Sequence, residues 1–484
     1  MGSFPNGTGS AIKRTGNVRY WQEEITFLLL KKDTSIWGCP FLLFIKTSNI
    51  MPGLGYVSLN KFQQDPSIVS ISIDESVCGI IFDISKRENL FDDYPIINQY
   101  FGNGQVQIVT NMEDVEAFGI VNNGFLSGVP YYHLSQFYKY IEKDATLYIM
   151  FADCSESFEA IQQMQLIAKG AIYQVGIWTE QPLWYKDGDD YRFTELLTNI
   201  KVQTDELCGM IDQPTDSSSP LSIILCANTA WLNDSTDSVV NFKKIPYARD
   251  LEMPKISILL GQDGTDEVHQ MQQNNYQNCP VGYLGLAMAC CYLAPAEESI
   301  GYVDNYDLNK NDDLNNPELG FGDIESCNYN PMDKISYTRA NIISLNGYII
   351  PVRYKAKEAC LYFSNDQTLS EKDYQTLALN RVIHKCKRVV RSVLLPFINS
   401  NAVIDAATGR LTATSITVFT NMILNALDQK LINVRGQEQI NGRFVDIDDE
   451  QNIIDTDEIR IEYTVVPVNT NTQIRLEELY TTNA

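Results

Sequence analysis

Histidine is scarce in this sequence of 484 residues, and the usual ligand motifs are missing. Of the three histidines, His133, His269 and His384, none has a second His, a Cys or an Asp at metal-ligand spacing. The eleven cysteines form no CxxC pair, and several lie in apolar runs, as Cys226 does, which is typical of buried thiols. With no secretory signal, they indicate a reducing cytoplasm. We expect no metal site.

Sequence motifs for nucleotide or acyl chemistry are also missing. Gly261-Gln-Asp-Gly264 follows an apolar run but lacks the GxxxxGK[ST] spacing of a phosphate loop, so an ordinary strand-to-helix turn is the better interpretation. No G-x-S-x-G elbow occurs, although a Ser-His-Asp triad need not be sequential. The carboxylates of 307–313 lack the spacing of an EF-hand and indicate a solvated loop. We therefore expect no cofactor.

Long apolar runs and excess positive charge are absent as well. The apolar runs 25–30 and 41–45 are separated by Lys31-Lys32-Asp33, and neither reaches the roughly 20 residues that span a bilayer. The net charge of −24 argues against nucleic-acid binding, which needs a basic face. The sequence thus predicts neither a nucleic-acid partner nor membrane insertion.

Residues 1–50 differ from the rest of the chain. Six Lys or Arg and three Asp or Glu give them a net charge of +3, whereas the remaining 434 residues carry −27. We interpret 1–50 as an upstream extension or a misassigned start. Native protein that begins at Met51 or Pro52 by mass spectrometry would support this interpretation, and peptides from before Met51 would refute it.

The middle of the chain has an α/β pattern. Continuous apolar runs predict buried strands at 77–82, 146–151, 171–178, 221–227 and 255–260. Helical patterns lie between them at 112–118, 155–169 and 193–209, so we expect a largely parallel sheet. Residues 281–294 form a small-residue helix suited to close packing. We place this core domain at 77–340, with a polar surface loop near 304–323.

The C-terminal part, 341–484, predicts an α+β domain. Apolar residues at three- and four-residue steps indicate a long amphipathic helix from Ser370 to Leu395, with Ser370 and Asp373 in a capping-box-like start. An Asp405–Gly409 turn and a second helix at 413–432 follow. Two strands, 444–447 and 459–466, complete the pattern, and the second alternates apolar and polar residues as a half-buried strand does.

The long helix carries a basic cluster in an otherwise acidic chain. Lys385, Lys387, Arg388 and Arg391, with Arg381, lie on it. One interpretation is a solvated helix face. The other is a basic stripe that forms ion pairs with an acidic neighbouring subunit.

The order of these C-terminal features resembles that of contractile tail sheath proteins. The segment Tyr362-Phe-Ser-Asn-Asp-Gln-Thr368, a long helix, an Asp-x-x-Thr-Gly turn, a helix and a strand that ends in Val-Val-Pro-Val follow one another as they do in sheaths of myovirus tails, tailocins and contractile injection systems. The resemblance extends over about Met51–Leu479. Met51-Pro-Gly-Leu-Gly-Tyr-Val resembles the natural start of such a chain.

The resemblance implies a multidomain sheath subunit with extended N- and C-terminal arms. Residues 51–76 would form the N-terminal arm, with Val57 and Leu59 in a strand given to a neighbour, although an edge strand of its own domain remains an alternative. The C-terminal strand would either accept a strand from a neighbouring subunit or be donated to one. It contains Ile459, Ile461, Tyr463 and Val465. Intersubunit ion pairs are expected at Lys385, Arg388 and Arg391.

The partners that the resemblance implies are other copies of the same chain, in stacked hexameric rings around an inner tube protein, with baseplate and tail terminator proteins at the ends. Contraction would drive the tube through a cell envelope, and no nucleotide would be needed. Two alternatives remain open. One is an α/β enzyme with a ligand crevice near Gly261 or Asp153, and the other is a different tail component, of the baseplate or the tube.

Overall fold

The structure is a computed structural model, which describes 74–468 except for 88, 123–127, 189, 208–218, 229–244, 264–267, 269, 272–280, 310–318, 324–327, 332–336, 355–359, 372–373, 399, 401–402, 433–437 and 457. The chain divides into two units, Met1–Met51 and Pro52–Ala484. Everything described below lies in the second unit, and the predicted extension at 1–50 lies outside the described residues.

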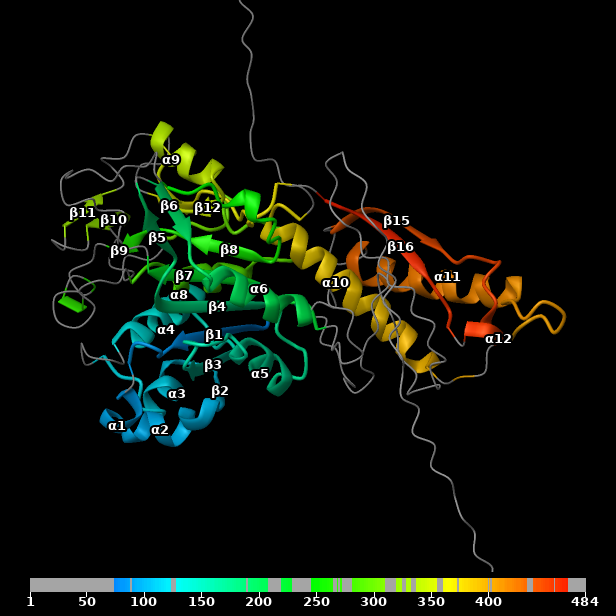
Figure 1. Ribbon diagram of the computed structural model, residues 1–484, viewed down its shortest axis with the longest axis horizontal. Coiled ribbons are helices and arrows are strands. Elements are labelled where there is room, and N and C mark those ends of the chain that lie inside the picture. Colours follow the sequence, from blue (N-terminus) through cyan, green and yellow to red (C-terminus); the bar gives the residue numbers. More distant parts are fainter. Residues whose placement is uncertain are drawn as a thin grey trace, which may run out of the picture. The chain divides into compact units, whose positions relative to one another are not determined.

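A seven-stranded sheet forms the centre of the fold, in the order β12-β8-β7-β4-β1-β3-β2 (Figure 1). Neighbouring strands are parallel, except that β2 runs antiparallel to β3. The strands are β1 (Cys78–Asp83), β2 (Val106–Val109), β3 (Leu147–Ala152), β4 (Gln174–Pro182), β7 (Ser222–Asn228), β8 (Ile256–Leu259) and β12 (Tyr348–Ile349). The predicted parallel sheet is therefore confirmed.

Continuous apolar sequence explains why these strands are central. Every residue of β1 and β8 is buried, because helices cover both faces of a parallel sheet. The elements around the sheet are α1 (Leu90–Asp93), α2 (Pro95–Phe101), η1 (Gly102–Gly104), α3 (Met112–Ala117), α4 (Gly128–Ile141), α5 (Ala160–Ile167), α6 (Leu196–Leu207), η4 (Arg249–Leu251), α8 (Leu284–Leu293) and α9 (Tyr337–Leu345).

Helix α5 is shorter than predicted. It begins at Ala160 rather than near Ser155, whose backbone N–H donates instead to the Asp153 carboxylate in the preceding loop. The helix ends at Ile167 with Ala168 as its C-cap, and Gly170, with a φ of +75°, closes the turn by donating its N–H to the carbonyl of Gln165.

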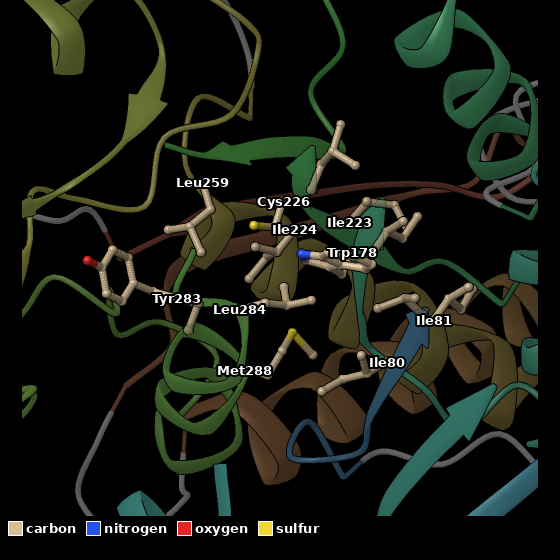
Figure 2. Close-up of a cluster of buried hydrophobic side chains, with 14 of the residues drawn as sticks. Ile80, Ile81, Trp178, Ile223, Ile224, Cys226, Leu259, Tyr283, Leu284 and Met288 are labelled. Atoms are coloured by element: carbon tan, nitrogen blue, oxygen red, sulfur yellow. The ribbon is translucent and has the colours of Figure 1, made fainter. Parts of the chain in front are cut away.

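Helix α8 packs closely on its neighbours through small residues, as predicted. A β-carbon at Gly285 would overlap the carbonyl oxygen of His133 on α4. On the sheet side, a β-carbon at Gly176 of β4 would lie 3.0 Å from atoms of Leu284 and Met288. Figure 2 shows Leu284 and Met288 pointing toward the strand residues of this core. Glycine on both sides lets the backbones approach.

Smaller sheets flank the central one. Hairpin β5 (Trp184–Asp187) and β6 (Asp190–Phe193) follows β4. A three-stranded sheet combines β9 (Gln262–Asp263), β10 (Leu319–Asp323) and β11 (Asn328–Pro331). The polar loop predicted at 304–323 is therefore wrong at its end, because β10 pairs with β9 and β11 through main-chain groups, for which polar side chains are no obstacle.

The C-terminal part forms a second hydrophobic core. It is built from α10 (Leu377–Leu394), η7 (Leu395–Phe397), α11 (Ala413–Leu427), the π-helix η8 (Asp428–Ile432), β15 (Ile440–Asp446), α12 (Ile453–Thr456) and β16 (Glu462–Pro467). The turn at Asp405 is confirmed, because its carboxylate accepts from the N–H groups of Ala407 and Thr408. The long helix ends at Leu394, one residue before the predicted Leu395, and Pro396 lies in the following η7.

Helix α10 begins seven residues later than predicted. Thr376, not Ser370, is its N-cap, and the Thr376 hydroxyl accepts from the N–H of Leu379. Ser370 is buried and donates to the carboxylate of Glu252 instead. The Ser370 side chain, which the local pattern predicted as a helix cap, is therefore used in a hydrogen bond to a residue distant in sequence.

The first core extends past the predicted boundary at residue 341. Strand β12 joins the central sheet beside β8, and β13 (Pro351–Val352) pairs with β14 (Tyr362–Phe363). Buried residues as late as Leu377 belong to the first core. The change from one core to the other therefore lies at the start of α10.

Candidate subunit interface

Strands β15 and β16 form a two-stranded antiparallel sheet at the end of the described chain. Val445 pairs with Tyr463, and Arg443 pairs with Val465. Figure 1 shows the sheet beside α10 and α11. Within the described part of 74–468 no third strand joins either edge, so the outer N–H and C=O groups of this sheet face no further strand there.

The two faces of this sheet differ. The predicted interface residues Ile459, Ile461, Tyr463 and Val465 pack against the second core of their own subunit. On the other face Phe444 is 63% exposed and Val466 is 52% exposed. The four predicted side chains therefore hold the sheet on its own helices, and among the described residues the strand edges and the outer face remain uncovered. The arm residues Val57 and Leu59 lie outside the described residues.

Arg388 of α10 is buried inside the subunit. Its Nη1 donates to the carbonyl of Gly170 at 2.5 Å, and its Nη2 donates to those of Ile172 at 2.7 Å and Pro220 at 2.8 Å. The guanidinium also lies over the ring of Tyr173. The carbonyls come from the loops that lead into β4 and β7, so this cation joins α10 to the central sheet.

Arg381, two turns earlier on α10, makes a similar contact. It donates to the carbonyls of Cys291, Ala294 and Pro295, at 3.0, 2.5 and 3.2 Å. These are carbonyls at the C-terminal end of α8, where the helix leaves acceptors unsatisfied and the dipole favours a cation. Two buried guanidinium groups thus connect the second core to the first.

Four of the five cations in the basic cluster are therefore buried rather than part of a solvated face, and Lys387 is half-buried. Lys385, Arg388 and Arg391 are all buried, and Lys385 forms an ion pair with Glu75. The sequence pattern assigned these three cations to a contact between subunits, whereas the structure places them within one. For Arg388 and Lys385 the reason is that the acceptors, three carbonyls and a carboxylate, lie far away in sequence, where no local pattern reveals them.

A buried carboxylate lies at the carboxyl end of β1, on the side of the sheet where an α/β enzyme would bind a ligand. Asp83, the last residue of β1, accepts from the Thr179 hydroxyl at 2.5 Å, the Gln181 amide at 2.8 Å and the Ser85 hydroxyl at 2.9 Å. It also accepts from the N–H of Cys154 at 3.1 Å. Sequence reasoning missed this network, although an aspartate that ends an apolar run was its signal.

The two positions suggested for an enzyme crevice are occupied by the chain itself. A β-carbon at Gly261 would lie 3.2 Å from the ring of Tyr283 and 3.4 Å from Pro351, so these side chains cover the turn. Asp153 is exposed, and its carboxylate accepts from a backbone N–H in its own loop. Neither position presents an open polar cluster.

The histidines that the structure describes, His133 and His384, are buried and not exposed to a substrate. Burial lowers the pKa of His133 to about 3, and its ring stacks with Phe82. Burial, then the nearby cations, chiefly Lys255, hold the pKa of His384 well below its usual value. Across the described ranges, no group of three or more His, Cys, Asp or Glu side chains is placed to bind a metal ion. No helix of the described part is long and apolar enough to cross a membrane.

A family model described as the C-terminal domain of DUF2586 matches residues 373–483, which include α10 to β16. No curated protein matches the chain. Among solved structures, the contracted sheath complex of the extracellular contractile injection system PVC is similar, with a TM-score of 0.51 and 13% identity. The match covers 90% of this chain and 99% of that chain. The chain therefore has the fold of a contractile sheath subunit.

Two further structures match over 90% of this sheath-fold chain and 100% of their own. They are the contracted helical sheath of the anti-feeding prophage (AFP), with a TM-score of 0.49 and 12% identity, and a chain of the AFP baseplate, with 0.47 and 9%. The expected fold class, mixed α/β with a sheath-like arrangement, is confirmed by the match to the PVC sheath.

Proposed function

We propose that the chain is the structural subunit of a contractile sheath. Copies polymerise as stacked hexameric rings around an inner tube, and contraction of the polymer drives the tube through a target envelope. The observation that carries this proposal is the sheath fold, which extends over 90% of the chain. No other described strand pairs with the edges of the β15–β16 sheet, which supports a surface on which one copy can receive another.

The link between copies is main-chain pairing. In this proposal the N-terminal arm of one copy, 51–76, which contains Val57 and Leu59, and the chain end after Pro467 add strands to the β15–β16 sheet of neighbours. Added strands bind through backbone N–H and C=O groups, so the link depends little on side-chain identity. Ile461, Tyr463 and Val465 contribute by fixing the acceptor sheet on its own core.

A structural rather than catalytic role agrees with how the central sheet ends. The Asp83 network fills the place where related α/β architectures bind ligands. In this proposal the free energy for contraction is stored during assembly. The inner tube protein, the baseplate and a tail terminator are the further partners, and the particle is a phage tail, a tailocin or an injection system assembled in a bacterial cytoplasm.

Electron microscopy of the purified protein tests the proposal directly. We expect helical tubes or stacked rings from the full chain, alone or with its tube protein. A chain that stays monomeric under all assembly conditions, and whose melting temperature rises with a small-molecule ligand, would support an enzyme instead.

A deletion tests the arm separately. Removal of Met51–Asn60 should leave a folded monomer that cannot polymerise, because the donated strand is lost while both cores remain. Removal of residues 1–50 is the matched control and should leave polymerisation unchanged. Loss of folding on removal of Met51–Asn60 would show that the segment belongs to the core of its own subunit.

A further inference from the structure

An ion pair joins the start of the described chain to the long helix. Lys385 Nζ lies 2.8 Å from Glu75 Oε1, and the two side chains are 5% and 19% exposed. The partners are 310 residues apart in sequence. Glu75 lies at the C-terminal end of the segment 51–76 that we propose as the N-terminal arm.

Residues 74–77, just before the central sheet, make several hydrogen bonds and one ion pair. The Asp74 carboxylate accepts from the N–H of Ser76 at 3.1 Å and from its hydroxyl at 2.7 Å, which makes a tight turn. The carbonyl of Val77 accepts from the N–H of Tyr173 at 3.0 Å, and β1 then begins. Glu75 lies at the tip of this turn, and its carboxylate contacts α10.

Helix α10 also carries the acceptor sheet. Cys386, the residue after Lys385, is buried in the second core, as are Val389 and Val390. Tyr463 and Val465 of β16 pack against the same core. The arm root, 74–77, and the proposed acceptor, β15–β16, are therefore both attached to one helix.

We infer that the Lys385–Glu75 ion pair fixes the position of the arm root relative to the acceptor sheet, and thereby the spacing between a subunit and the copy that it joins. The inference rests on the proposed function. Each subunit donates a strand from its arm and accepts a strand at its β15–β16 sheet. The distance and direction between these two places therefore set the spacing between successive subunits in the polymer. The ion pair fixes the arm root to α10, and the Arg381 and Arg388 contacts fix α10 to the first core.

The chemistry of the pair suits a positioning role. If Glu75 moved away, the buried Lys385 ammonium would lose its ion-pair partner, which is energetically costly. This cost keeps the Glu75 carboxylate beside Lys385. Removing both charges together avoids that penalty. The double variant Glu75→Gln/Lys385→Met therefore separates positioning from folding, because it keeps the side-chain volumes and leaves no charge buried alone.

The test compares the wild type, this double variant and a matched control. The control, Asp187→Asn/Arg192→Met, removes a pair whose side chains are 49% and 65% exposed on the β5–β6 hairpin. For the double variant we expect a melting temperature close to that of the wild type. We also expect at least tenfold faster hydrogen exchange of amides 74–77 in the monomer, and at least a tenfold higher critical concentration for polymerisation. The control should match the wild type in all three measurements.

Two results would overturn the inference. One is unchanged exchange at 74–77 in the double variant, which can be measured on the monomer whether or not polymers form. The other is polymerisation of the double variant at the wild-type concentration and with the wild-type repeat by electron microscopy. A wild type that never polymerises would instead overturn the proposed function, and the inference that rests on it.

Discussion

The guanidinium of Arg388 lies over the ring of Tyr173, with its central carbon 4.0 Å from the ring centroid. The same group donates to three backbone carbonyls of the first core. A cation on a helix of the second core is thus enclosed by the first. Buried polar contacts of this kind connect the two cores, in agreement with the proposed role as a sheath subunit.

Replacement of Arg388 by Met should be strongly destabilising. The buried carbonyls of Gly170 and Pro220 would lose the Arg388 donor, at about 1–3 kcal/mol each, whereas that of Ile172 would keep the Gln165 amide. With the loss of packing around the buried side chain, we expect the free energy of unfolding to fall by about 3–5 kcal/mol. Urea denaturation measures it. Arg192→Met, on an exposed arginine, should change it by less than about 0.5 kcal/mol. Equal effects would show that the buried contact has no special role.

Gly285→Ala should destabilise the packing of α8 on α4. The added β-carbon would overlap a backbone oxygen, which cannot rotate away, so we expect a loss of about 1–3 kcal/mol or more. Gly128→Ala is the control, because a β-carbon there would lie 3.7 Å from the Met271 sulfur, an ordinary contact. Thermal unfolding compares the two, and a Gly285→Ala protein as stable as the control would contradict the close approach.

Stability should fall as the pH is lowered, in part because of His133. Its pKa is about 3 in the folded chain and about 6.5 when exposed, so the unfolded state takes up the proton first. This contribution is fully present above pH 6.5 and is lost as the pH falls toward 3, at about 1.4 kcal/mol per pH unit. His133→Phe should reduce that slope in denaturation curves between pH 6.5 and 5. An unchanged slope would show that His133 accepts a proton while folded.

Neighbouring valines of β16 should respond differently. Val465 is half-buried and packs against the second core, so Val465→Thr should cost about 1 kcal/mol of unfolding free energy by placing a hydroxyl against apolar side chains. Val466 is on the exposed face, and Val466→Thr should change stability by less than about 0.5 kcal/mol. Equilibrium denaturation distinguishes them, and the reverse order would mean that the strand faces are exchanged.

The sequence by itself determined most elements of the fold. Continuous apolar runs identified β1, β3, β7 and β8 as buried strands, because a strand covered on both faces must be apolar throughout. Strict alternation identified the half-buried β16. Small residues identified α8 as a closely packed helix. These features depend on local periodicity and composition, which a single sequence contains.

The tertiary structure alone decided how the polar residues are used. The start of α10 moved from Ser370 to Leu377 because Glu252 takes the Ser370 hydroxyl. The cations of α10 turned inward because their acceptors lie in distant loops, and Glu75 became the partner of Lys385 across 310 residues. Hydrogen bonds and ion pairs of this kind depend on which distant segments the fold brings together, and a local sequence pattern does not contain that information.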